Sequence, residues 1–229
     1  MPIRLTARLS MLASMIPKCE CIADIGCDHG RLAVYALQNN ICNRVIAVDI
    51  SETCAAKAAR LVRRCGLSQR CEIRVGNGME VLKEGEAQVV VISGIGGPEI
   101  KRILAKGSAD CYILQAMNHT AQVRRWLSCN CYRIIDEKIC IQDNKFYEIL
   151  RAERGCSILT QAECEFGPVL LKRRDPDALK YLLYRKNLLQ ESIEQMKNKH
   201  TPRAEMDRET LTNRLKMYDE AQSWLESGK

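Results

Sequence analysis

Short apolar runs alternate with amphipathic stretches along the first two thirds of the chain. Five runs have the length and composition of buried strands, and apolar residues recur between them at the three- and four-residue spacing of helices. The predicted strands cover 21–25, 45–49, 71–75, 87–93 and 111–115, and the predicted helices cover 5–16, 30–38, 51–65, 79–83, 98–105 and 121–127. Two further runs, 132–141 and 145–152, flank Gln142-Asp143-Asn144 and predict a hairpin. Strand–helix units ending in a hairpin predict an α/β fold whose mainly parallel sheet has an antiparallel edge.

The pattern changes after residue 155. Residues 156–174 look irregular, and from Asp175 onward two long helical patterns follow, joined by His200-Thr201-Pro202. Each helix carries one apolar seam, which Lys186 interrupts in the first and Gln222 in the second. We therefore predict two domains, an α/β domain over 1–155 and a C-terminal connector and antiparallel helical hairpin (a coiled coil) over 156–229.

Composition narrows the class of protein. The chain has 229 residues, of which 46% are hydrophobic and 28% charged, as in soluble globular proteins. No apolar run approaches the roughly 20 residues that span a bilayer, and the N-terminus lacks a signal peptide's apolar region, so we expect a cytoplasmic protein. The 13 cysteines include no Cys-x-x-Cys pair. We interpret them as reduced core residues, with Cys19/Cys21 and Cys129/Cys131 each entering a strand, and expect no metal site.

The segment Ala23-Asp24-Ile25-Gly26-Cys27-Asp28-His29-Gly30 is the most informative motif. Gly26 permits close approach of a ligand to the backbone, and Gly30 permits a tight start of the next helix. Asp49 ends the following strand, where a carboxylate can bind ribose hydroxyls. Asp28 would repel a pyrophosphate but suits the ammonium group of S-adenosylmethionine. The alternative is a polar helix cap without a ligand.

Three more loops follow strands of the predicted sheet, at the edge where open α/β sheets bind ligands. Gly76-Asn77-Gly78 offers an amide that can contact an adenine edge, or serves only as a turn. Ser93-Gly94-Ile95-Gly96-Gly97 leaves room for a flat substrate. Gln115-Ala116-Met117-Asn118-His119 supplies polar groups that can orient a base.

With the first motif, these loops and the C-terminal hairpin, the chain resembles the bacterial tRNA (adenine-N1)-methyltransferases that modify adenosine 22, the TrmK family. The resemblance covers nearly the whole chain and implies a Rossmann-like class I methyltransferase fold, S-adenosyl-L-methionine as cofactor, with 1–155 as the domain that binds it, and tRNA as substrate. It departs at Asn77, where the family often has Asp, and at Ala116-Met117, where the family has a proline between Gln115 and Asn118. It implies that Asn118, Gly94, Gly96 and Gly97 position the target base. It implies a cofactor site of Asp24, Gly26, Asp28, His29, Asp49, Ile50, Asn77, Gly78 and Ser93.

Adenine N1 has a free lone pair, so we expect alignment to drive the reaction without a strong general base. The formal net charge of +7 permits a polyanionic partner, with Arg4, Arg8 and the cluster Lys172-Arg173-Arg174 as candidate phosphate contacts. We expect Asp28→Ala to abolish cofactor binding. Two alternatives stay open: a non-catalytic RNA-binding module, and a methyltransferase for a small molecule or protein. We expect a monomer or a weak dimer, because the hairpin can clamp tRNA or pair with a second copy.

Overall fold

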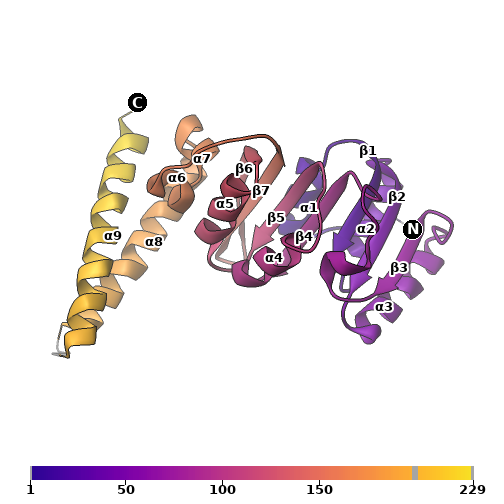
Figure 1. Ribbon diagram of the computed structural model, residues 1–229, viewed down its shortest axis with the longest axis horizontal. Helices are drawn as coiled ribbons and strands as arrows, with labels where there is room; N and C mark the ends of the chain where they lie inside the picture. Colours follow the sequence, from indigo (N-terminus) through magenta and orange to yellow (C-terminus); the bar gives the residue numbers. More distant parts are fainter. Residues whose placement is uncertain (1, 198–200, 228–229) are drawn as a thin grey trace. The chain divides into compact units, whose positions relative to one another are not determined.

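The computed structural model describes residues 2–197 and 201–227, so His200 of the predicted linker lies outside the described residues. The chain divides into two compact units, Met1–Ile158 and Leu159–Lys229. The first unit holds one seven-stranded sheet of order β3-β2-β1-β4-β5-β7-β6 (Figure 1). Its strands are β1 (Cys19–Ile25), β2 (Cys42–Asp49), β3 (Cys71–Val75), β4 (Val89–Ile95), β5 (Cys111–Ala116), β6 (Tyr132–Gln142) and β7 (Lys145–Arg154).

The first five strands are parallel, and β7 pairs antiparallel with both β5 and β6. Asp143 and Asn144 have φ angles of 51° and 56°, which form the tight turn between β6 and β7. The predicted α/β sheet with an antiparallel edge is therefore confirmed. The chain order reverses between β1 and β4, and ligands of open α/β sheets bind at such a reversal, beside the carboxyl ends of the strands.

Helices cover both faces of the sheet. Leu12, Leu37 and Val62 from three helices pack with Ile22 and Val91 of the strands in one buried cluster. The helices of that face are α1 (Ala7–Met15), α2 (Arg31–Gln38) and α3 (Glu52–Arg64). Strand side chains alternate between faces, so the other face bears a second set of buried residues, beside α4 (Gly97–Leu104) and α5 (Thr120–Cys129). Burial on both faces explains the uninterrupted apolar runs of the central strands.

The structure differs from three predictions about local structure. Residues 156–174 are not irregular, because they contain α6 (Gln161–Phe166) and α7 (Pro168–Arg173). Thr160 and Glu163 form a capping box at the start of α6, and both helices are too short to show a helical repeat. Cys129 ends α5 instead of entering a strand. The predicted short helix after β3 is a 3₁₀ turn over Gly78–Val81.

The second unit contains the predicted antiparallel helices, α8 (Pro176–Met196) and α9 (Pro202–Glu226), which lie side by side (Figure 1). Their seam buries Leu182, Leu189, Tyr218, Ala221 and Leu225. The two polar residues that interrupt the seam meet each other, because Lys186 Nζ donates to Gln222 Oε1 at 2.7 Å. A polar pair at facing seam positions favours a single register of the two helices.

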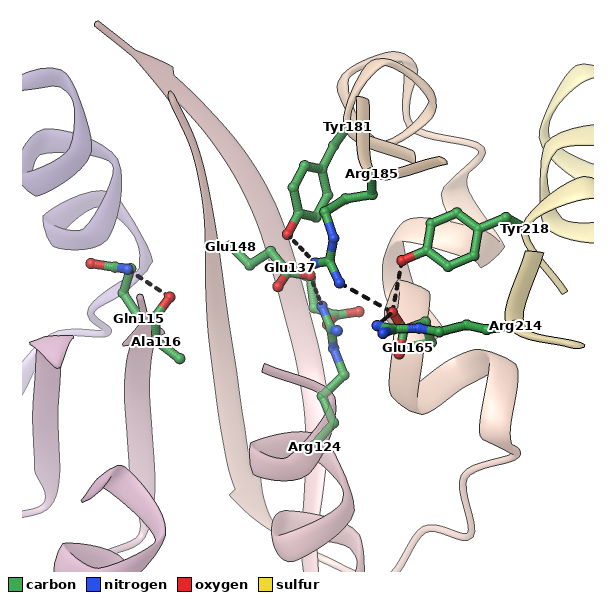
Figure 2. Close-up of polar contacts among 10 residues, drawn as sticks. All are labelled: Gln115, Ala116, Arg124, Glu137, Glu148, Glu165, Tyr181, Arg185, Arg214 and Tyr218. Atoms are coloured by element: carbon green, nitrogen blue, oxygen red, sulfur yellow. Dashed lines mark hydrogen bonds and ion pairs between the residues drawn. The ribbon is translucent and has the colours of Figure 1, made fainter. Parts of the chain in front are cut away.

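Each unit holds a cluster in which one charged side chain binds several partners (Figure 2). In the first unit, Arg124 of α5 is fully buried and donates to Glu137 at 2.7 Å and to Glu148 at 3.0 Å. In the second, Glu165 accepts hydrogen bonds from Arg185, Arg214 and Tyr218. In the described part of the chain, no helix combines the length and the apolarity required to cross a bilayer.

We expect Arg124→Met to lower the free energy of unfolding by about 3–5 kcal/mol, because it leaves two carboxylates buried without their cation. Urea denaturation at neutral pH measures the change. The control is Arg102→Met, which breaks an exposed pair with Glu99 and should cost less than about 1 kcal/mol. Equal losses in the two variants would contradict a special role for the buried triad.

Candidate functional site

A cavity of about 830 Å³ opens at the carboxyl ends of β1, β2 and β4, within the size range of cofactor sites. Its lining includes ten of the thirteen predicted site residues, namely Asp24, Gly26, Asp28, His29, Asp49, Ile50, Asn77, Gly78, Ser93 and Gly94. Gly96, Gly97 and Asn118, the other three, lie outside this lining among the described residues. The sequence motifs that follow β1, β2, β3 and β4 thus come together in one concave site.

The turn after β1 presents its backbone to the cavity. Gly26, Asp28 and Gly30 have φ angles of 72°, 49° and 67°, the left-handed region that favours glycine. A Cβ atom at Gly30 would lie 2.9 Å from the Cβ of Ala58 on α3, so Gly30 is required for close packing of that turn against α3. No described atom would lie within 4 Å of a Cβ atom at Gly26. The space at Gly26 leaves its backbone open to a ligand.

Asp49 connects the loops that follow three neighbouring strands. Its Oδ2 accepts the Asp28 N–H at 2.9 Å, and its Oδ1 accepts the Ser51 N–H at 2.9 Å. Its carbonyl oxygen accepts the Gly76 N–H at 3.0 Å. Each carboxylate oxygen keeps a second lone pair, so the group can still accept hydrogen bonds from a ligand's hydroxyls. Asp49 therefore combines the predicted binding position with a structural role that the sequence did not indicate.

Asp24 is the most unusual group of the cavity. Its residue is only 5% exposed, and its Oδ2 has no hydrogen-bond partner among the described residues. Burial, together with the nearby charge of Asp49, raises the pKa of the Asp24 carboxyl from 3.8 to about 7. A buried acid without a partner destabilises the protein unless a ligand supplies one.

Asp28 and His29 form a pair at the opening of the same cavity. His29 Nδ1 lies 2.7 Å from Asp28 Oδ2, and the two side chains are 51% and 64% exposed, respectively. The Asp28 carboxylate is therefore exposed and already paired, whereas Asp24 is buried and its Oδ2 has no partner among the described residues. The geometry therefore favours Asp24 as the partner of a cationic ligand group, whereas the sequence pointed to Asp28.

The far end of the cavity carries apolar surface suited to a flat ring. Ile50, which is 73% exposed, and Ile103 line it together with Asn77 and Gly78. A Cβ atom at Gly78 would lie 3.0 Å from Ile103, so glycine lets the loop after β3 approach α4. Sequence spacing placed Asn77 and Gly78 here but missed Ile103, because α4 reaches this loop only through tertiary packing.

The glycine loop after β4 is more regular than predicted. Strand β4 continues to Ile95 through an irregularity between Ser93 and Ile95, where Gly94 has a φ angle of 80°. Gly94 lines the cavity, and its N–H donates to the side chain of Gln115 at 3.2 Å. Gln115 is fully buried and also donates to the carbonyl of Ala116 at 2.9 Å (Figure 2).

Gly97 and Asn118 contact each other beside the cavity. A Cβ atom at Gly97 would lie 2.7 Å from the carbonyl oxygen of Asn118 and 2.8 Å from that of His119. The Gly97 N–H donates to the Asn118 carbonyl at 3.1 Å and lies 3.3 Å from its Oδ1. Two of the predicted base-positioning residues thus join the start of α4 to the loop after β5.

Several residues that line the cavity were absent from the predicted site. They are Leu9, Arg31, Leu32, Glu99, Arg102 and Ile103, together with Arg8, which we predicted only as a phosphate contact. They belong to α1, α2 and α4. Arg8, Leu9, Arg31, Leu32 and Glu99 stand near the starts of these helices, which is their only signal in the sequence, whereas Arg102 and Ile103 stand in the last turn of α4 and carry no such signal.

Three comparisons with known proteins agree. A family model described as "Methyltransferase domain" matches residues 5–150. The tRNA (adenine(22)-N(1))-methyltransferase of Bacillus subtilis (strain 168) is 36% identical over 189 residues, which cover 78% of this chain and 79% of that protein.

Two crystal structures are similar over almost the whole chain. The B. subtilis M1A22 tRNA methyltransferase TrmK has a TM-score of 0.89 at 33% identity, with 96% of this chain and 99% of that chain covered. Streptococcus pneumoniae Sp1610 in complex with S-adenosyl-L-methionine has a TM-score of 0.86 at 26% identity, with coverages of 96% and 100%. Fold, cavity and sequence identity therefore lead to one conclusion: the chain belongs to the tRNA (adenine(22)-N(1))-methyltransferase family.

Proposed function

We propose that this protein transfers the methyl group of S-adenosyl-L-methionine to N1 of an adenosine in tRNA. We propose position 22 for this adenosine, because the names of the relatives give that position. The observation that carries the proposal is the buried, unpartnered carboxylate of Asp24 in a cavity built from the predicted motifs. The relative with 36% identity supports tRNA as the substrate, and the S. pneumoniae complex supports the cofactor.

The residues of the cavity suit the cofactor's chemical groups. Asp24 would hold the ammonium group, because a cation compensates its buried charge. Asp49 would accept hydrogen bonds from the ribose hydroxyls. Ile50 and Ile103 would contact the adenine ring, whose edge the amide of Asn77 would read. The backbone of Gly26, Gly78 and Ser93 leaves the ligand room, and Asp28 and His29 close the methionine end.

The cofactor supplies an electrophilic methyl group. Adenine N1 attacks this carbon with its lone pair, the sulfur–carbon bond breaks, and the positive charge moves from sulfur to the adenine ring. No proton has to leave before the attack, so the protein's task is to align the base with the methyl group. We infer that Gly94 and the loop joined by Gly96, Gly97 and Asn118 provide that alignment, with the base exposed from its stack.

The compartment we propose is the cytoplasm. No disulfide joins any of the 13 cysteines, all of which belong to the described residues, and seven of them are buried. Such use of cysteine is usual where a reducing environment keeps thiols unpaired.

We expect the purified protein to methylate an unmodified tRNA transcript that has adenosine at position 22. The measurement is transfer of a labelled methyl group, followed by identification of the modified nucleoside. A transcript with guanosine at that position is the matched control and should accept no label there. Label on a protein or a small molecule, or none at all, would favour one of the two alternative functions instead.

We expect Asp24→Asn to weaken binding of S-adenosyl-L-methionine at least about tenfold, because it removes the carboxylate that compensates the ammonium charge. Asp28→Ala is the comparison variant. The sequence alone led us to expect that Asp28→Ala abolishes cofactor binding. Because the Asp28 side chain is exposed, we expect Asp28→Ala to reduce cofactor affinity less than Asp24→Asn does. Calorimetry measures both affinities, and equal binding by Asp24→Asn and wild type would refute the assignment.

The pKa of Asp24 also predicts a dependence on pH. Because the pKa is raised from 3.8 in the unfolded chain to about 7 in the folded protein, Asp24 increasingly destabilises the folded state as pH rises from about 4 to 7. Asp24→Asn should therefore gain stability relative to wild type across this range, and the difference should level off above pH 7. Urea denaturation at pH 4.5, 6 and 7.5 measures it, and a constant difference would contradict the raised pKa.

Cofactor affinity should show the opposite trend. Binding of the ammonium group favours the ionised carboxylate, so wild-type affinity should rise between pH 5.5 and pH 7. The affinity of Asp24→Asn should change less over the same range, which separates Asp24 from other titrating groups. Parallel curves for the two proteins would exclude Asp24 as the titrating group.

A further inference from the structure

Arg8 of α1 lies at the end of the cavity where the glycine loop follows β4. A Cβ atom at Gly94 would lie 3.6 Å from Arg8 Nη1 and 3.9 Å from Nη2, so the guanidinium borders that loop directly. Arg8 also lines the cavity. Under the proposed function, this is the end at which the target base meets the methyl group.

Two contacts hold this guanidinium in place, and a third holds the Arg8 backbone. Arg8 Nη1 donates to Oε1 of Gln115 at 2.5 Å, and the same oxygen accepts the Gly94 N–H at 3.2 Å. The guanidinium carbon lies 5.5 Å from the ring centre of Tyr147, and the Arg8 N–H donates to the side chain of Gln142 at 3.0 Å. Because Gln115 is fully buried and also bonds Ala116, its orientation is determined by the sheet.

The charge of Arg8 has no carboxylate partner in the described part of the chain. Among the described residues it forms no ion pair with a carboxylate, whereas Arg102 on the same cavity pairs with Glu99 at 2.5 Å. Gln115 is a neutral amide, so it orients the guanidinium and leaves its charge available to a ligand. An arginine held in this way is suited to bind an anion.

The reaction itself limits which anion this can be. Methyl transfer places positive charge on the adenine ring, so a cation directed at the reacting edge of the base would oppose it. A tRNA substrate carries one negative phosphate at each nucleotide. We propose that Arg8 binds a backbone phosphate beside the target adenosine, with Gln115 as the positioning residue that holds the guanidinium against Gly94. This inference rests on the proposed function, since it requires tRNA as the substrate.

The main test compares tRNA binding by wild type, Arg8→Gln and Arg8→Lys, measured by filter binding with S-adenosylhomocysteine present. We expect Arg8→Gln to weaken tRNA binding about tenfold and to reduce the slope of log affinity against log salt by about 0.7–0.9, the value of one phosphate contact. Arg8→Lys should restore the slope and part of the affinity. Cofactor affinity should change less than tRNA affinity in both variants, and an equal or larger loss of cofactor affinity would assign Arg8 to the cofactor's carboxylate and overturn the proposal.

A second variant tests the contact with Gln115. Gln115→Glu keeps an acceptor for the Gly94 N–H but places a carboxylate beside the Arg8 guanidinium. Because this carboxylate neutralises the charge of Arg8, the variant should weaken tRNA binding as much as Arg8→Gln does. Because both changes remove the same available charge, the double variant should show no further loss. Additive losses would overturn the role of Gln115.

Arg154→Gln is the matched control. Arg154 ends β7 and pairs with Asp110 at the start of β5, at the opposite edge of the sheet from the cavity. Arg154→Gln also removes one positive charge, but it should change the tRNA affinity and its salt dependence less than Arg8→Gln does. Equal effects of the two variants, or wild-type binding by Arg8→Gln, would overturn the proposal.

Catalysis separates this inference from the proposed function. A wild-type protein that binds tRNA but methylates none of it would contradict the proposed function, while the binding comparison would still decide the role of Arg8. If the wild type methylates tRNA, Arg8→Gln should raise the KM for tRNA about tenfold, the same factor as in binding.

Discussion

The hydrogen bonds of Asp49 are the contacts on which the rest of the site depends. Its two carboxylate oxygens and its carbonyl accept N–H groups from the loops after β1, β2 and β3, at Asp28, Ser51 and Gly76. Parallel strands bring these loops to one edge of the sheet but do not determine their conformation. The charged Asp49 carboxylate, which accepts hydrogen bonds from two backbone N–H groups, helps to determine that conformation. Hydrogen bonds to a charged group are about twice as strong as those between neutral groups. The cavity is therefore shaped before any ligand binds.

The burial of Asp24 in this cavity destabilises the folded protein in the absence of a ligand. Its carboxylate is buried close to that of Asp49 and has an oxygen without a partner in the described structure, so the folded protein holds it at a raised pKa. Elsewhere in the same unit the buried charges are compensated, as at Arg124 with Glu137 and Glu148. An uncompensated buried acid occurs where a cationic ligand group would complete the pair, which is typical of functional sites.

The sheet and most of its helices could be predicted from the sequence, because burial on both faces makes the strands uninterrupted apolar runs and leaves the helices a 3.6-residue repeat. The loops could be predicted too, since Gly26, Gly78 and Gly94 stand at or near strand ends and adopt positive φ angles. The two short helices α6 and α7 could not, because about six residues are too few to show a period. The hydrogen bond between Lys186 and Gln222 could not be predicted either, because it depends on how the two helices align. The sequence showed only that each residue interrupts an apolar seam.

The sequence by itself determined the class of fold through its periodicity, and its resemblance to a known family supplied the family and the nine proposed cofactor-binding positions. Tertiary structure alone decided how those positions differ. It buried Asp24 and exposed Asp28, and it brought Arg8 of the first helix against Gly94 through Gln115, more than 100 residues further along the chain. The physical reason is that burial and charge compensation depend on neighbours in space, which no spacing along the chain records.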